Sequence, residues 1–161
     1  MQKRTKLYIA YGSNLNIEQM QYRCPAAKPV GVSELPGYTL LFRGEYNAVA
    51  TIEPGEDDVP VLLWRVTPED ERALDVYEGW PHLYRKETLE VELDGAPVDA
   101  MIYIMNGNPP LGMPTQRYYE TILEGYESAG FDMSALDRAL ERSEAALEIE
   151  PAEALDFRWW E

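Results

Sequence analysis

The chain has very few of the residues that build disulfide frameworks and zinc sites, with one cysteine, Cys24, and one histidine, His82. A single cysteine cannot form an internal disulfide, and this pair falls short of the usual zinc ligand sets. The first apolar run ends at Gly12, too early for a signal-peptide core or a membrane span. We therefore expect a cytoplasmic protein with no membrane partner, no metal and no other cofactor.

Positive charge is also scarce. The 161 residues include 14 Lys and Arg against 29 Asp and Glu, which gives a formal net charge of -15. A surface with this excess of negative charge repels polyanions, so we expect no nucleic acid partner. Arginines such as Arg23, Arg43 or Arg85 could offset this charge locally for a small anionic ligand, and the sequence leaves open which of them face its site.

The chain shows no internal repeat with a period of about 20–50 residues, which excludes a solenoid. The 45% share of hydrophobic residues can build one packed core, so we expect a single main domain. Alternating or continuous apolar runs predict strands at Leu7–Tyr11, Tyr38–Phe42, Ala48–Ile52, Val59–Val66, Tyr84–Leu93 and Val98–Met105. Pro36-Gly37 is expected to form a turn, and the stretch EPGEDD a solvated loop.

Capping signals predict the helices. Asn16 followed by Gln19, and Thr67 followed by Pro68, are typical helix starts, and Gly79 is a typical stop. The expected helices are Ile17–Arg23, Pro68–Tyr77, one that begins at Thr115 and ends before Gly130, and Met133–Leu147. Strands that come first and helices that cluster late predict an α+β domain with a curved or barrel-like sheet.

The segment YIAYGSNL, Tyr8–Leu15, ends a β-prone run in a Gly-Ser-Asn turn just before a helix. Gly12 allows a ligand to approach closely, and the amides of Ser13, Asn14 and Leu15 could converge on a carboxylate or phosphate. The alternative is a plain strand-to-helix connection capped by an asparagine. The turn alone does not decide between the two.

The segment ALDVYEGWPHLYRKE places Glu78 at the end of a predicted helix, between Tyr77 and Trp80. The helix dipole disfavours a carboxylate there and the two rings would exclude water, so both effects should raise the pKa of Glu78. A glutamate of this kind can take and return a proton near neutral pH. The alternative is that Glu78 is one of many solvated acids.

Tyrosines supply the third group of candidate residues. Tyr103 lies within a predicted strand, and Tyr118, Tyr119 and Tyr126 share a predicted helix. Buried tyrosines either pack in a core or direct a hydroxyl into a cleft, and their positions alone leave both uses open. A nucleophilic triad would need His82 to meet Ser13 or Cys24 by coincidence, so we do not expect one.

Taken together, YIAYGSNL, then YEG after a capped helix, then YIM in a strand and TQRYY at a helix start resemble, in order and spacing, the γ-glutamylcyclotransferase-like family with its plant avirulence-induced (AIG2-like) relatives. The resemblance covers roughly Lys6–Leu140. It implies an α+β fold for residues 1–147, a small mixed β-barrel with flanking helices and a cavity at its mouth. Residues 148–161, with Trp159 and Trp160, are expected to pack on this domain or on the second subunit of a homodimer.

The resemblance also implies an activity, release of 5-oxoproline from a γ-glutamyl amine or peptide by attack of the substrate's own α-amine. It assigns Glu78 as the general acid and base. It further implies a set of substrate-binding residues: Tyr11, Gly12, Ser13, Asn14, Leu15, Tyr103 and Tyr118. Tyr77 and the Trp-Pro-His stretch depart from the glutathione-pathway enzymes, which leaves the leaving group open. The alternative function is a non-catalytic binding module for a small acidic metabolite.

Overall fold

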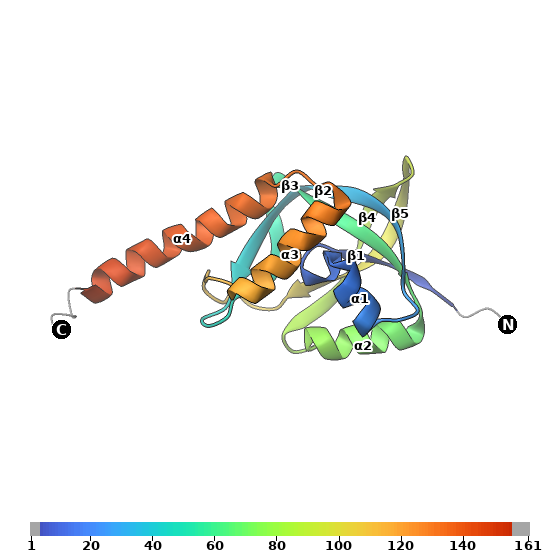
Figure 1. Cartoon of the computed structure of the whole chain (residues 1–161), viewed down its shortest axis with the longest axis horizontal. Helices are drawn as coiled ribbons and strands as arrows, with labels where there is room; N and C mark the ends of the chain where they lie inside the picture. The colour runs from blue at the N-terminus through green and yellow to red at the C-terminus, as the bar shows by residue number, and fades with distance from the viewer. Residues whose placement is uncertain (1–3, 156–161) are drawn as a thin grey trace.

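The computed structural model describes residues 4–155, with side chains from residue 4 to residue 147. The elements in chain order are β1 (Lys6–Ala10), the short 3₁₀ helix η1 (Ser13–Leu15), α1 (Ile17–Arg23), β2 (Lys28–Arg43), β3 (Val49–Val66), α2 (Pro68–Glu78), β4 (Tyr84–Leu93), β5 (Ala96–Met105), α3 (Gln116–Ala129) and α4 (Ser134–Leu155). Figure 1 shows α3 and the start of α4 lying across the curved sheet, while α2 lies below it. The α+β class is as the sequence predicts.

The five strands form one mixed sheet in the order β2-β3-β1-β5-β4. The central strand β1 is antiparallel to β3 and parallel to β5. The edge strands β2 and β4 approach each other at Gly31, where an added Cβ would lie 2.7 Å from Leu93 Cδ1. No ladder joins these two edges among the described residues, so the sheet is curved but open and the expected barrel is not closed.

The breaks predicted inside β2 and β3 are wrong. Pro36-Gly37 forms a register shift within β2, with Gly37 at a φ of +79°, and residues 53–58 continue β3 alongside it. Most of this acidic stretch is exposed, as predicted, but it is strand rather than loop because it pairs with β2. Asp57 within it is held by two arginines of α4, Arg138 at 3.2 Å and Arg142 at 3.0 Å. A glycine that relieves strain within a strand has the same sequence signature as a turn.

The helix starts and stops follow the capping chemistry. The Asn16 side chain accepts from the Gln19 amide at 3.1 Å, and a reciprocal capping box joins Thr67 to Asp70 at the start of α2. Gly79 ends α2 in the left-handed conformation, with a φ of +67°. These local bonds fix where α2 ends and therefore where Glu78, its last residue, is placed.

Helix α4 runs to Leu155, beyond the end predicted at Leu147, and leaves the body of the molecule in Figure 1. The tail residues Trp159 and Trp160 lie outside the described residues, and so does their expected packing. No helix in the described part of the chain is long and apolar enough to cross a membrane.

Candidate active site

The turn after β1 is held from the core. The indole Nε1 of Trp64, a fully buried residue of β3, donates to the Asn14 carbonyl oxygen at 3.1 Å. The Leu15 amide donates to the Gly12 carbonyl oxygen at 3.0 Å, and the Leu15 side chain is buried with 1% exposed. The structure therefore brings the turn of residues 12–14 to the surface of a pocket and places Leu15 in the core instead.

The amides of Ser13 and Asn14 donate to no other group in the described part of the chain. Gly12 leaves the space in front of these two amides open. A Cβ at residue 12 would lie 3.3 Å from Ala50 Cβ and 3.7 Å from the Tyr118 hydroxyl, and so would fill part of that space. Two unpaired amides beside a glycine leave backbone donors within reach of a small anion.

These residues line a narrow pocket with a cavity volume of about 20 Å³. The lining consists mainly of tyrosines and the turn after β1, and comprises Tyr8, Tyr11, Gly12, Ser13, Asn14, Ala50, Glu78, Tyr84, Tyr103 and Tyr118. Glu78 therefore shares one pocket with the Gly12–Asn14 turn, although Glu78 and Asn14 are 64 positions apart along the chain.

Burial raises the pKa of Glu78 to about 7, and the nearby positive charge of Arg23 opposes part of this rise. The sequence predicts this direction, but from the helix dipole and from shielding by the neighbouring rings. Tyr77 and Trp80 are in fact 43% and 42% exposed, and Trp80 does not line the pocket. The pocket tyrosines, which come from other elements, provide the desolvation.

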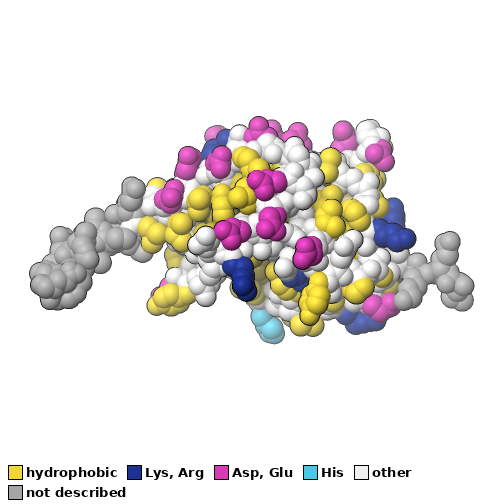
Figure 2. All heavy atoms as spheres, viewed as in Figure 1, with side chains coloured by type: hydrophobic (Ala, Val, Ile, Leu, Met, Phe, Trp, Pro, Cys, Tyr) yellow, Lys and Arg dark blue, Asp and Glu magenta, His cyan; other side chains and the backbone are white. Residues whose placement is uncertain are grey.

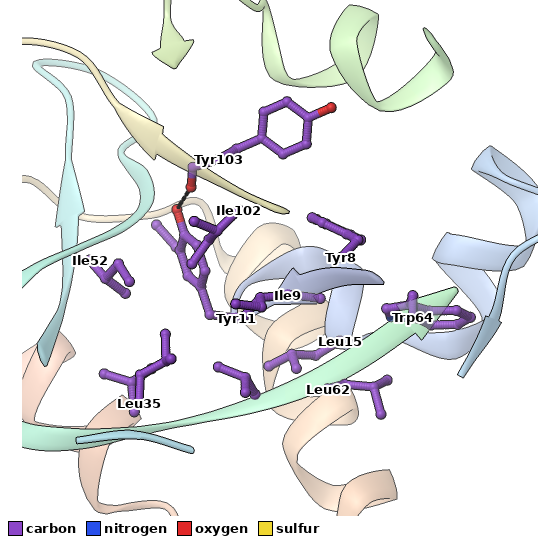
Figure 3. Close-up of a cluster of buried hydrophobic side chains, with 14 of the residues drawn as sticks. Tyr8, Ile9, Tyr11, Leu15, Leu35, Ile52, Leu62, Trp64, Ile102 and Tyr103 are labelled. Carbon is purple, nitrogen blue, oxygen red and sulfur yellow. Dashed lines mark hydrogen bonds between the residues drawn. The ribbon is translucent and has the colours of Figure 1, made fainter. Parts of the chain in front are cut away.

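The pocket hydroxyls divide into two groups by their hydrogen bonds. Three donate their protons to fixed acceptors: Tyr11 to the Tyr103 carbonyl oxygen at 2.6 Å, Tyr84 to the Ala50 carbonyl oxygen at 2.6 Å, and Tyr103 to Asp75 Oδ1 at 2.6 Å. Figure 3 shows the first of these bonds, with the Tyr103 ring pointing away from Tyr11. These three oxygens can offer only lone pairs to a ligand.

The other two hydroxyls accept from the protein. Tyr8 accepts from Asn14 Nδ2 at 2.9 Å, and Tyr118 accepts from the Ala50 amide at 3.0 Å. Each keeps a proton to donate. The pocket therefore combines donors on Tyr8, Tyr118 and the turn with acceptors on the remaining tyrosines and Glu78, a pattern suited to a small zwitterion.

Sequence reasoning did not identify Tyr8, Ala50 and Tyr84 as site residues. Tyr8 lies within the motif that predicts the turn, but its register on β1 decides that it faces the pocket. Ala50 contributes backbone groups, and Tyr84 begins β4 with no local signal. Only the packing of separate strands brings these three together.

Tyr77 and Arg23 form the rim of the pocket. The Tyr77 hydroxyl and Ser13 Oγ are 2.8 Å apart, so a side chain of α2 reaches the turn after β1. Arg23 Cζ lies 3.4 Å from the centre of the Tyr77 ring, and the Arg23 guanidinium donates to the Asn14 side-chain oxygen. These contacts set a cation beside the mouth.

The candidate nucleophiles do not meet a base. Burial raises the pKa of the Cys24 thiol to about 12, so almost none of it is thiolate near neutral pH. His82 does not line the pocket, and Ser13 Oγ pairs with a phenol. In the part of the chain that the structure describes, no group of three or more His, Cys, Asp or Glu residues could hold a metal ion.

The chain is similar to known proteins over the segment that contains this pocket. Residues 8–125, which include all ten lining residues, match the model of a family described as gamma-glutamyl cyclotransferase, AIG2-like. A mouse gamma-glutamylcyclotransferase is 30% identical over 138 residues, covering 78% of this chain and 72% of its own length. The human protein of the same name is 28% identical over 141 residues, with coverages of 79% and 73%.

The fold is shared with solved structures as well. A structure titled gamma-glutamyl cyclotransferase superposes with a TM-score of 0.75 at 24% identity, covering 84% of this chain and 86% of that one. At this identity the likeness shows a common fold.

Proposed function

The chain belongs to the γ-glutamyl cyclotransferase, AIG2-like family, and from this membership we propose that it releases 5-oxoproline from a γ-glutamyl amine or peptide. The observation that carries the proposal is the shared pocket of Glu78 and the Gly12–Asn14 turn. It supplies one proton-transferring group and a set of backbone donors, and no protein nucleophile. A γ-glutamyl compound needs none, because its own α-amine reaches its γ-carbonyl in a five-membered ring.

In the proposed reaction the Glu78 carboxylate takes a proton from the substrate's α-ammonium group. The freed amine attacks the γ-carbonyl carbon, so a carbon–nitrogen bond forms and the carbonyl oxygen becomes negative. The original amide bond then breaks while Glu78 returns its proton to the departing nitrogen. A second proton passes from the ring nitrogen to the released amine. The products are 5-oxoproline and the leaving amine in its protonated form.

The pKa of Glu78 supports this double role. A pKa of about 7 leaves both the carboxylate and the acid well populated near neutral pH, whereas an ordinary glutamate, near 4.5, would be a weaker base and a scarcer acid. The partly buried position limits contact between this carboxyl group and bulk water.

The polarity of the hydroxyls supports the binding part of the proposal. The unpaired amides of Ser13 and Asn14, together with Tyr8 and Tyr118, are donors for the α-carboxylate and the oxyanion. The lone pairs of Tyr11 and Tyr103 suit the ammonium group. Holding the substrate folded places amine and carbonyl together, which supplies much of the rate of an intramolecular reaction.

The experiment is to incubate the protein with a panel of γ-glutamyl amines, amino acids and peptides and to measure 5-oxoproline. Release from at least one compound is expected. The alternative, a binding module for a small acidic metabolite, makes a different prediction. It gives saturable thermal stabilisation by 5-oxoproline or glutamate with no product from any compound.

A further inference from the structure

Arg23 differs from the other cations that the sequence offers near the site. Arg43 pairs with Glu53 at 2.5 Å, and Arg85 pairs with Glu87 at 2.5 Å. Arg23 is partly buried, and no carboxylate among the described residues lies within 4.0 Å of its guanidinium. Its charge is therefore not neutralised by an ion pair within this part of the chain.

The guanidinium is nevertheless held in place. One side lies against the Tyr77 ring at 3.4 Å, and Nη1 donates to the Asn14 side-chain oxygen. A weaker bond of 3.4 Å runs from Nη2 to Gln19 Oε1 at the exposed side. A planar cation fixed by stacking, with N–H groups left over, is suited to bidentate binding of a carboxylate.

The position of Arg23 indicates which part of a ligand it meets. Asn14 and Ser13 line the pocket, whereas Arg23 and Tyr77 do not line it and sit at its rim. The glutamyl group, which carries the reacting atoms, has to lie inside, beside Glu78 and the turn. The group attached to the γ-carbonyl is then the part that extends toward the rim.

Long-range charge makes this local cation more significant. The net charge is -15, and Figure 2 shows acidic side chains scattered over the face that carries α3 and α4. An anionic compound approaching this protein is repelled in general and attracted near an unpaired guanidinium. A selective contact with a second carboxylate is therefore favoured at the rim.

Resting on the proposed function, we propose that Arg23 binds a carboxylate of the leaving group, so that the preferred substrates are γ-glutamyl amino acids and peptides rather than γ-glutamyl amines. Arg23 is then a specificity-determining residue. The Tyr77 ring beneath it offers an apolar surface, 43% exposed, for the side chain of the leaving amino acid.

The test uses two probes that differ by one carboxylate, γ-glutamyl-alanine and γ-glutamyl-ethylamide. Their affinities are measured by calorimetry on the Glu78→Gln variant, so that binding is read without turnover. We expect the alanine compound to bind about 10- to 100-fold more tightly, the range of charge-assisted hydrogen bonds. Arg23→Gln, made in the same background, should reduce this preference to about 3-fold or less, and Arg23→Lys should keep an intermediate part.

Arg65→Gln is the matched control, because it removes the same charge from an exposed arginine that does not line the pocket. It should keep the full preference. Equal affinity for the two probes, or a preference that survives both Arg23 variants, would overturn the inference. Turnover separates the two proposals: product from both probes at equal kcat/KM contradicts the role of Arg23 alone, whereas a binding preference without any 5-oxoproline contradicts only the proposed function.

Discussion

The Tyr103 hydroxyl donates to Asp75 Oδ1 at 2.6 Å, and this bond connects the pocket to a chain of ion pairs outside it. Asp75 lies 2.8 Å from Lys86 Nζ, which also contacts Glu71 at 2.7 Å. Because the Tyr103 hydroxyl donates its hydrogen bond to Asp75, only lone pairs of its oxygen remain for a ligand. The orientation of a pocket residue thus depends on charges on α2 and β4.

A double-mutant cycle measures this bond. Asp75→Ala and Tyr103→Phe should each lower the free energy of unfolding, and the double variant should cost less than the sum. The difference is expected to be about 1.5–3 kcal/mol, as for a hydrogen bond to a charged group. Chemical denaturation of the four proteins gives the value, and additive losses would show that the two side chains act independently.

The pH dependence of kcat/KM should report the carboxyl group of Glu78. The base form is required in the free enzyme, so activity should rise with pH through an acid limb with a midpoint of about 7. Initial rates of 5-oxoproline formation, measured between pH 5 and pH 8, test this. A midpoint near 4.5, the value of an ordinary glutamate, would mean that Glu78 is solvated or is not the base.

The free energy of unfolding should also depend on the ionisation of Glu78, and it should fall over the pH range in which activity rises. The pKa of Glu78 is higher in the folded state than its ordinary value of 4.5, so the folded protein binds more protons between pH 4.5 and about 7. Stability from this group is therefore present below pH 4.5 and is lost as the pH rises to about 7, by about 3 kcal/mol.

Glu78→Gln removes that loss. As the pH rises from 4 to 8, the free energy of unfolding of the variant should increase by about 3 kcal/mol relative to that of the parent, because the glutamine amide does not ionise. Urea denaturation of both proteins at the two pH values measures the difference. A constant difference between parent and variant would contradict a raised pKa at this position.

Gly12 should be required for the space in the pocket. Gly12→Ala adds a Cβ 3.3 Å from Ala50 Cβ and beside the Tyr118 hydroxyl, so kcat/KM should fall by about 10-fold or more, a loss of over 1.4 kcal/mol in transition-state binding. Ala50→Gly in the same chain removes the opposing Cβ and should restore part of the activity. Full activity in Gly12→Ala, or no rescue by the second change, would contradict this explanation.

Local chemistry explains what could be predicted from the sequence. The ends of α1 and α2 follow from caps at Asn16, Thr67 and Gly79, which act over a few residues. The position of Glu78 at a helix end was predicted for the same reason, whereas the direction of its pKa was predicted from the helix dipole and neighbouring rings and arises from burial by other elements. The β4–β5 hairpin follows from its Asp94-Gly95 turn, where both residues have positive φ.

Pairing between distant segments explains what could not be predicted. The register shift at Gly37 depends on β3 continuing alongside it, and the open sheet depends on how far β2 and β4 approach each other. The burial of Glu78 comes from Tyr11, Tyr84 and other residues on separate elements. None of these contacts has a signature in the neighbouring sequence.

The most direct test of the account compares 5-oxoproline release by the parent protein, Glu78→Gln and a control, Glu18→Gln, an exposed residue of α1. With any γ-glutamyl compound that the parent converts, Glu78→Gln should lose about 10³-fold in kcat while still binding the compound, and the control should keep full activity. Turnover by Glu78→Gln at a rate close to that of the parent would contradict the role of this carboxyl group in proton transfer.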